Sequence, residues 1–571
     1  MATTSGFTIA VGGTPLPDTV MLQLVSAYVD TNTGLPDAFA LRFRDNARGV
    51  LTDGGIRIGA PIRIAISTDA QPAPKDLLIG EITAIEAEFE KSGTFTTVRG
   101  YDQSHRLFRG RHTAAFTQAT ASDAATQCAR RAGLRPGRIV ASPTVYDHIS
   151  QRDQTDWEFL TALARGIGYR VGVCDGALDF GPPTEAQSAP GADPENPLVL
   201  RFGVDITRLR SSITAAEQVG HVEVRGWDVA TKQPIVGTAQ PDAPSARLGD
   251  VDPAGLAGVF GNRTHVESDR GLRSQAEADE AARARAQTIA SGYCEIDAVC
   301  TGNPALRAGV AVAVSDLGAP FDGKFVLTAA RHRYEPNGGY TTAIAVSAAH
   351  DRSLLGLTSA GAARPGDRGA GVVVAQVTDI NDPEGRGRVR LAFPQLSDDY
   401  VSGWARTVMA GAGKDRGALI MPEVGDEVLV AFERGDGDHP YVLGGLFNGV
   451  DTPDKRGVTL VDNGSGAANR RSVVSRRGHR IDLNDEDGRT EGVVVATGDD
   501  ALRIELDAVG RAITVRSAGT IAIKADQGIT LDAGAGTLGL RGGRVTVDAS
   551  TAAQLSASGP LTVQGTPIKL N

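Results

Sequence analysis

A short apolar motif recurs through the C-terminal part of the chain. Two apolar residues flank one other residue, and the motif returns every seven to nine residues, with mostly Gly, Ala, Ser, Asp and Thr between its copies. Such alternation predicts a short strand with one face turned to a core, and a regular period predicts a repeated structural unit. The pairs are Ile504/Leu506, Ile513/Val515, Ile521/Ile523, Ile529/Leu531, Leu538/Leu540, Val545/Val547, Ala553/Leu555, Leu561/Val563 and Ile568/Leu570.

A single chain of such strands buries too little apolar surface to offset the entropy of ordering it. It also leaves both edges of every strand unpaired. Three chains wound about one axis solve both problems, because each inward pair then stacks on its two partners and neighbouring chains close the edges. The alternative, a single-chain β-solenoid, needs about 20 residues per coil. We therefore expect residues 501–571 to form an intertwined trimeric β-helix (the needle), with the pairs from Ile504 to Val563 other than Ala553 as its core.

Residues 372–450 have the pattern of a small all-β domain. Five short apolar segments alternate with turns that contain Gly, Pro and Asp, which predicts a Greek-key barrel of the OB type. The Gly-, Ala- and Arg-containing stretch 359–371 is the predicted linker before this domain, and residues 451–500 are the predicted connector into the needle. The expected strands of the barrel are 372–377, 387–393, 405–409, 427–432 and 441–446.

Residues 1–358 contain both strand and helix periodicities, so that the expected fold class of the whole chain is mainly β with some α. A stripe of small apolar residues predicts a helix at 122–132. Two capping boxes of the form S/T-x-x-E begin at Thr155 and Ser274, and they predict the N-termini of two more helices. Alternating segments predict strands at 21–29, 38–43, 56–66 and 95–98.

Composition narrows the classes of partner. The formal net charge of the 571-residue chain is −10 and no long Lys/Arg cluster occurs, which argues against nucleic acid as a partner. The N-terminus lacks the features of a signal peptide, and no apolar stretch approaches the ~20 residues that span a bilayer. The cysteines form no CxxC pair, so we expect buried or half-buried free thiols. They are Cys128, Cys174, Cys294 and Cys300.

Motifs that carry chemistry are weak in this chain. Residues 318–324 match the first positions of a P-loop, but Phe325 stands where Ser or Thr would hold magnesium, so we predict a structural turn. The acidic run 482–488 departs from the EF-hand pattern and predicts a hairpin turn. His105 and His479 are expected to form structural hydrogen bonds. We therefore predict no catalytic residue, no cofactor and no metal site.

Several motifs resemble those of VgrG-type spike proteins of contractile injection systems, which have phage tail-spike hubs as relatives. The resemblance covers essentially the whole chain, and its most specific part lies in the predicted OB domain. The motifs are GYDQSHRL at 100–107, TDWEFL at 155–160, EGRGRVRLAFP at 384–394, WAR at 404–406, PEVGDEVLVAF at 422–432, LGGLFNG at 443–449 and RGHRI at 477–481.

The resemblance implies an assembly. Residues 1–358 would form an α+β hub that contains barrels, and three hubs would adapt a hexameric tail tube to a threefold spike. The OB domain would form a collar, and the end of the needle would carry a PAAR-type tip protein. Further implied partners are the tail tube protein, baseplate proteins and, transiently, the target membrane. The residues implied in docking the tip protein are Ile568, Lys569, Leu570 and Asn571.

The resemblance also implies where the protein acts. It would be assembled in the bacterial cytoplasm, without a signal peptide, as part of a phage tail-like particle. The segment LPDAFAL at 35–41 favours the released extracellular type of particle over a type VI secretion system. We expect a structural protein without enzymatic activity. The alternatives are a spike with cell-wall hydrolase activity from an Asp/Glu pair in the N-terminal region, and a carbohydrate-binding adhesin.

Overall fold

The computed structural model describes residues 5–69, 71–193, 195–228, 231, 233–268, 272, 274–347, 371–394 and 397–569. The chain divides into two compact units, Met1–Asn448 and Gly449–Asn571. Of the predicted linker at 359–371, only Gly371 lies within the described residues.

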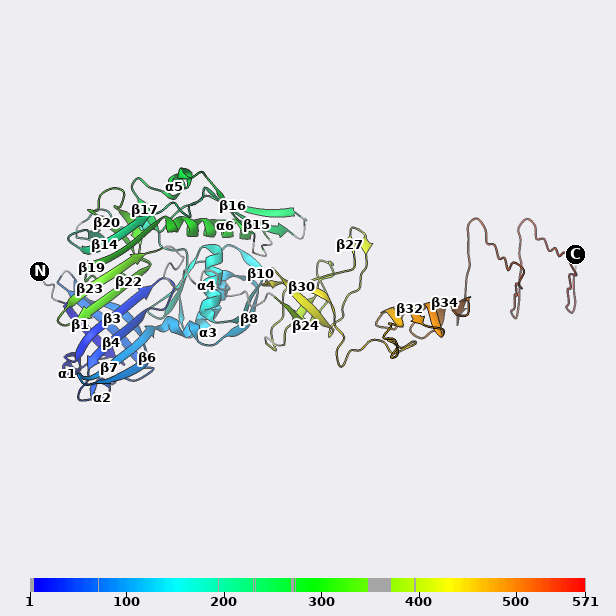
Figure 1. Ribbon diagram of the computed structural model, residues 1–571, viewed down its shortest axis with the longest axis horizontal. Coiled ribbons are helices and arrows are strands. Elements are labelled where there is room, and N and C mark those ends of the chain that lie inside the picture. The colour runs from blue at the N-terminus through cyan, green and yellow to red at the C-terminus, as the bar shows by residue number, and fades with distance from the viewer. Residues whose placement is uncertain are drawn as a thin grey trace. The chain divides into compact units, whose positions relative to one another are not determined.

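An 11-stranded antiparallel sheet dominates the first unit (Figure 1). It consists of β1 (Ser5–Val11), β2 (Thr14–Pro15), β3 (Leu24–Asn32), β4 (Ala38–Arg44), β5 (Pro61–Thr68), β6 (Gln71–Glu90), β7 (Gly93–Asp102), β14 (Ile206–Ile213), β19 (Cys294–Thr301), β22 (Ala329–Glu335) and β23 (Gly339–Val346). The order is β14-β19-β23-β22-β3-β4-β7-β6-β5-β1-β2, so that β3 pairs with β22 although about 300 residues separate them in sequence.

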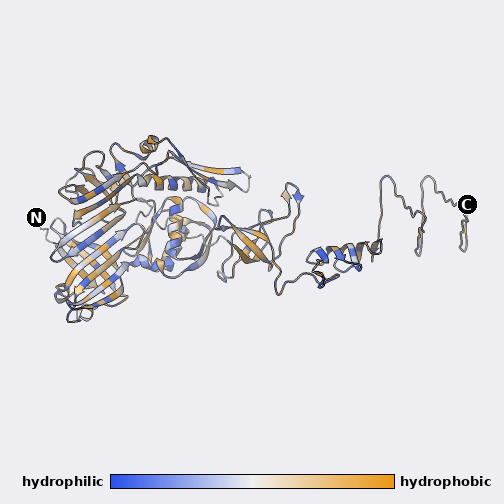
Figure 2. Ribbon diagram, in the orientation of Figure 1, coloured by the Kyte–Doolittle hydropathy of each residue, from blue (hydrophilic) through white to orange (hydrophobic). Residues whose placement is uncertain are grey.

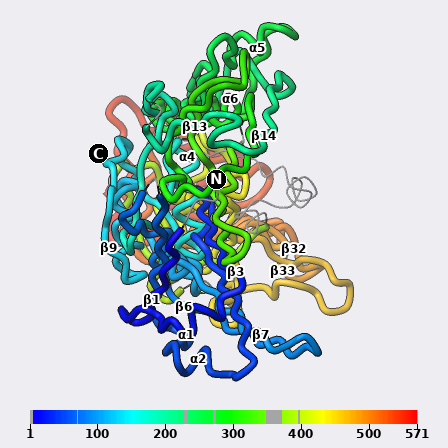
Figure 3. Tube along the Cα trace, turned by 90° about the vertical axis from the view of Figure 1, so that its left-hand side faces the viewer, coloured from blue at the N-terminus to red at the C-terminus, as the bar shows by residue number. Residues whose placement is uncertain are grey.

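The alternation that predicted strands also places the core. On β4, Phe39, Leu41 and Phe43 are buried while their neighbours are more exposed. Figure 2 shows hydrophobic and hydrophilic residues mixed along the strands of this sheet. The short helices α1 (Asp18–Met21) and α2 (Val50–Asp53) lie at one end of it, beside β1 and β7 (Figure 3).

The three predicted helices are present. They are α3 (Ala121–Arg131), α4 (Asp156–Ile167) and α6 (Gln275–Ala290). Thr155 and Glu158 form the predicted reciprocal capping box of α4, and the Ser274 side chain accepts a hydrogen bond from the backbone N–H of Glu277 at α6. A further box, Thr120 with Asp123, begins α3.

The remaining elements of the hub are strands, which form smaller sheets, and short helices. They are η1 (Gln103–Phe108), β8 (His112–Thr120), β9 (Arg135–Ile139), β10 (Val145–Gln154), β11 (Arg170–Cys174), β12 (Ala177–Gly181), η2 (Ala186–Ser188), β13 (Val199–Arg201), β15 (His221–Asp228), β16 (Gln233–Ala239), β17 (Ala246–Leu248), α5 (Pro253–Val259), β18 (Thr264–Glu267), η3 (Ser291–Tyr293), β20 (Ala311–Ser315) and β21 (Gly323–Val326). Of the P-loop-like residues 318–324, the first five lie in the predicted turn between β20 and β21, and the last two begin β21.

The predicted OB domain is a five-stranded sheet in the order β25-β24-β29-β30-β26. Its strands are β24 (Val372–Asp379), β25 (Arg390–Ala392), β26 (Arg406–Thr407), β29 (Glu427–Glu433) and β30 (Asp436–Gly445). Between β26 and β29 in sequence, β27 (Ala412–Gly413) and β28 (Arg416–Gly417) form a separate hairpin. Val389, Leu391, Phe393 and Val430 are buried in its core. The OB domain contacts the hub, since the Ser150 hydroxyl on β10 bonds to Asp438.

The second unit contains a five-stranded antiparallel sheet in sequence order. Its strands are β31 (Arg470–Val474), β32 (Arg480–Glu486), β33 (Thr490–Ala496), β34 (Leu502–Asp507) and β35 (Ala512–Ser517). The acidic run 482–488 lies in the β32–β33 hairpin, as predicted.

The predicted boundary between the connector and the needle falls inside this sheet, between β33 and β34. Residues 518–569 form no strand and are all exposed. The single chain therefore does not contain the predicted β-helix, because each short apolar segment beyond β35 lacks a neighbouring strand within its own chain.

Candidate functional site

The sheet β31–β35 presents a continuous apolar face. Its cross-strand register aligns Val473 with Ile481, Ile481 with Val495, Val495 with Ile504, and Ile504 with Val515. These aligned side chains form one row across the sheet. A second row of apolar side chains lies beside it, because residues two apart on a strand share a face. The apolar sheet face comprises Val473, Ile481, Leu483, Val493, Val495, Ile504, Leu506, Ile513 and Val515.

The opposite face of the same sheet is largely buried on β32 and β33, where it carries both polar and apolar side chains. The Arg480 side chain is 7% exposed, and its guanidinium pairs with Asp482 at 2.9 Å and Asp500 at 2.6 Å. Arg470 bonds to the backbone carbonyls of Asp454 and Arg456, which belong to the segment before β31. On β32 and β33 the sheet thus buries charged side chains within the chain, whereas its apolar face is left to solvent.

The apolar sheet face is unusual for a free surface. Exposure is 45% at Ile504 and 73% at Ile513, and most other members of the face are comparably exposed. Contiguous apolar patches of this kind mark interaction sites. The arrangement provides a large apolar contact area suited to association.

The predicted needle core is not buried within the single chain, contrary to what a core position implies. Four of its residues beyond β35 are the most exposed, with 70% at Ile523, 69% at Leu540, 75% at Val547 and 76% at Leu555. The physical reason is that residues 518–569 form no strand, so that neither a facing sheet nor an adjacent strand of the same chain covers these side chains. Their burial against partner chains stays a prediction.

The other predicted core residues of this segment are exposed for the same reason. Their exposed fractions range from 52% to 61%, and the last aliphatic side chain among the described residues, Ile568, is 47% exposed. These other core residues are Ile521, Ile529, Leu531, Leu538, Val545, Leu561 and Val563.

The residues predicted to dock a tip protein lie at the end of the same segment. Ile568 and Lys569 are exposed, and Leu570 and Asn571 lie outside the described residues. The docking role of all four stays a prediction.

The motif at 100–107 has a structural role in the hub. Asp102 caps η1 by accepting a hydrogen bond from the backbone N–H of Ser104. His105 and Arg106 both contact Glu81, with the His105 Nε2 atom 2.7 Å from the carboxylate. His479, in the second unit, accepts a hydrogen bond from the backbone N–H of Gly498 at 3.2 Å. Both histidines therefore make the structural hydrogen bonds that the sequence predicted.

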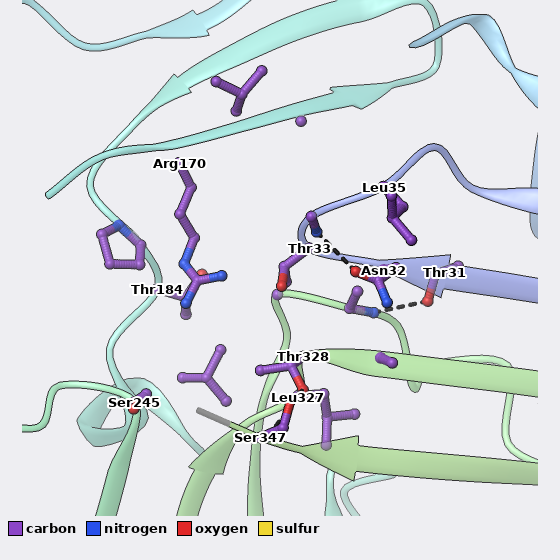
Figure 4. A pocket seen from close by; sticks show the side chains of 18 of the residues that line it. Thr31, Asn32, Thr33, Leu35, Arg170, Thr184, Ser245, Leu327, Thr328 and Ser347 are labelled. Carbon is purple, nitrogen blue, oxygen red and sulfur yellow. Dashed lines mark hydrogen bonds between the residues drawn. The ribbon is translucent and has the colours of Figure 1, made fainter. Parts of the chain in front are cut away.

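A cavity of about 1210 Å³ lies in the hub (Figure 4). Five arginines and five carboxyl side chains are among its lining residues. Arg170 has no carboxylate partner among the described residues, and burial lowers the pKa of its guanidinium. The charged lining residues are Asp37, Asp102, Arg138, Arg165, Arg170, Asp179, Arg210, Glu295, Asp297 and Arg307.

Two carboxyls of the cavity have perturbed acidity. Burial raises the pKa of Asp37 to about 6 and that of Asp102 to about 7. Each is engaged structurally, because Asp37 accepts a hydrogen bond from the backbone N–H of Asn32 and lies 3.6 Å from the guanidinium of Arg307. Asp102 accepts the hydrogen bond from the backbone N–H of Ser104.

Other candidate chemistry is sparse in the part of the chain that the structure describes. No group of three or more His, Cys, Asp or Glu side chains there is arranged to hold a metal ion, and no helix is long and apolar enough to cross a membrane. Burial raises the pKa of Cys128 and Cys300 to about 12, which makes these thiols unreactive. Cys174, at the end of β11, is exposed, contrary to the expectation of a buried or half-buried thiol.

Comparison with known proteins agrees with this architecture. A family model described as a type VI secretion system/phage-baseplate injector OB domain matches residues 373–447. A second model, described as an Alg8 N-terminal domain, matches residues 58–335.

Curated relatives are similar over part of the chain. The type VI secretion system spike protein VgrG1c of Pseudomonas aeruginosa is 27% identical over 126 residues, which are 21% of this chain and 17% of that protein. VgrG3 of Vibrio cholerae is 33% identical over 84 residues, 13% of this chain and 8% of that protein. The chain thus spans less than a fifth of the length of either relative.

Among solved structures, a chain of the lidded PdpA–VgrG complex of Francisella superposes with a TM-score of 0.52 at 9% identity, over 90% of this chain and 80% of that one. The fold therefore resembles that of a chain in this complex, and residues 373–447 resemble an injector OB domain of type VI secretion systems and phage baseplates. Over these partial matches, the chain is similar to the VgrG-type spike proteins of contractile injection systems.

Proposed function

We propose that three copies of this chain form the spike at the tip of a contractile injection system. The hub adapts a hexameric tail tube to threefold symmetry, and the OB domains form a collar. The needle is an intertwined trimeric β-helix, and Ile568, Lys569, Leu570 and Asn571 at its end dock a PAAR-type tip protein. The spike contacts the tube protein and baseplate proteins, and it touches the target membrane only during injection.

The observation that carries this proposal is the apolar sheet face together with its continuation along the needle. Burial of a large aliphatic side chain stabilises an assembly by about 1.5–3 kcal/mol relative to full exposure. Side chains that are roughly half exposed therefore each have about 1 kcal/mol to gain from contact with partner chains. A threefold axis beside the face would bring the same residues of three chains together.

The work of this spike is mechanical, and we propose no enzymatic activity. Asp37 and Asp102 are the carboxyls closest to the requirements of a hydrolase, because both line the cavity with raised pKa values. Their hydrogen bonds to Asn32 and Ser104 support a structural role instead. The segment LPDAFAL at 35–41 supports a released particle, with a type VI secretion spike as the alternative.

The substitution Ile529→Asp tests the needle. Its three copies would meet near the axis, and burying three carboxylates together would prevent trimer formation. Thr530→Asp is the matched control, because Thr530 lies between Ile529 and Leu531 and its side chain faces outward. Light scattering should give a trimer for Thr530→Asp and for the wild type, but not for Ile529→Asp. A stable Ile529→Asp trimer would refute the assigned needle core.

A further inference from the structure

The residues directly after the apolar pairs show a pattern of charge. From the end of the β31–β35 sheet onward, four successive pairs are followed by charges of alternating sign. Beyond them the same position is neutral, with Ser556 and Gln564. The charged residues are Lys524, Asp532, Arg541 and Asp548.

These charges follow the apolar repeat rather than an independent spacing. Consecutive members are eight, nine and seven residues apart, which are the intervals between the pairs themselves. All four residues are exposed, and none has an ion-pair partner within the described part of its own chain. In the antiparallel sheet the corresponding residues are Asp507 and Arg516, and there the strand ends that bear them lie at opposite ends of the hairpin.

The trimeric needle that we propose supplies the partners. Side chains alternate along a strand, so the residue after each inward pair points outward. When three identical chains wind in parallel about one axis, the strand above and below any strand belongs to a neighbouring chain. The outward residue of one repeat then lies beside the outward residue of the next repeat on another chain.

We propose that Lys524, Asp532, Arg541 and Asp548 form a ladder of ion pairs between chains, which sets the axial register of the three chains and selects identical partners. This inference rests on the proposed trimeric needle. Each charge in the ladder has an opposite charge on the adjacent layers of the ladder itself, while Arg516 precedes Lys524 and the neutral Ser556 follows Asp548. A one-repeat slip of any chain would juxtapose like charges. Because exposed ion pairs contribute little stability singly, the ladder acts mainly through discrimination between correct and incorrect pairing.

Co-expression of differently tagged chains tests the ladder. One chain is wild type, and the other carries the full inversion Lys524→Asp, Asp532→Lys, Arg541→Asp and Asp548→Lys, which restores alternation with unchanged net charge. Each chain alone should form trimers with wild-type heat resistance. Together they should sort, because most contacts in a mixed trimer would join like charges. Random assembly would give roughly three quarters mixed trimers, and we expect less than roughly one fifth.

Single changes provide the matched comparison. Asp532→Lys places three positive charges in succession, and it should lower the temperature at which the trimer dissociates. Asp526→Lys makes the same change of charge in the segment between two pairs and should leave that temperature unchanged.

The outcomes separate the ladder from the trimer. Statistical mixing of wild-type and inverted chains, or an inverted chain that forms no trimer of its own, would overturn the ladder while the trimeric wild type stands. Equal effects of Asp532→Lys and Asp526→Lys would also overturn it. A wild type that is monomeric by light scattering would overturn the proposed needle, and the ladder with it.

Discussion

Burial sets the acidity of Asp102, the residue that caps η1 in the hub. Its pKa of about 7 lies above the ordinary value of 3.8 because burial disfavours the carboxylate, and the charge of Asp37 raises it further. The folded state therefore holds this proton over a pH range in which the unfolded chain has released it. Its favourable contribution to stability is complete below about pH 4 and is lost as the pH rises toward 7.

The substitution Asp102→Asn removes this pH dependence. Asparagine keeps an oxygen that can accept the hydrogen bond from Ser104 and carries no charge to desolvate. The substitution changes the free energy of unfolding of the hub by one amount at pH 4 and by another at pH 8. We expect the change at pH 8 to be more stabilising by about 1–3 kcal/mol. Urea unfolding followed by tryptophan fluorescence measures both values. The exposed Asp250→Asn is the control, and an equal effect at both pH values would disprove the assigned acidity.

At the scale of elements, the apolar sheet face extends the needle interface upstream of the predicted boundary at residue 501. Ile481→Asp on β32 would place a carboxylate in the proposed interface, which we expect to destabilise the trimer by about 3–5 kcal/mol. Thermal dissociation followed by light scattering measures the loss. Val509→Asp is the control, because Val509 is equally apolar and 48% exposed but lies in the turn between β34 and β35. Similar dissociation temperatures for the two variants would rule out the face as an interface.

The apolar sheet face contains apolar pairs that the regular spacing of about eight residues did not identify. Ile481/Leu483 and Val493/Val495 repeat the same apolar pair motif as the needle, and both lie on the apolar sheet face. Their spacing is irregular because hairpin turns of several residues separate the strands, so a search for a period near eight does not detect them. A search for the pair motif alone, without a fixed period, would have found them.

Sequence patterns predicted those features of the hub that depend on residues close together in the sequence. The capping box at Thr155 and the alternation on β4 were confirmed, since caps and strand faces depend on neighbouring residues. The pairing of β3 with β22 could not be predicted, because no local pattern specifies a partner about 300 residues away. The Asp37–Asp102 proximity, and the pKa shifts that follow from it and from burial, depend on that same long-range packing.

At the scale of the whole molecule, the chain combines a self-contained hub and OB domain with a second unit that lacks its own apolar partner. Residues 1–448 bury several hydrophobic clusters of their own. The second unit instead exposes its largest aliphatic side chains from Val473 to Ile568. This contrast predicts that association is a condition for ordering the second unit, whereas the first unit folds without it.

The most direct test of the trimeric spike is the solution mass of the protein by light scattering, with and without residues 470–571. The account predicts a mass of three 59.3-kDa chains for the full-length protein. Removal of the apolar sheet face and the needle should lower the number of associated chains. A full-length protein with the mass of one chain would contradict the trimeric spike.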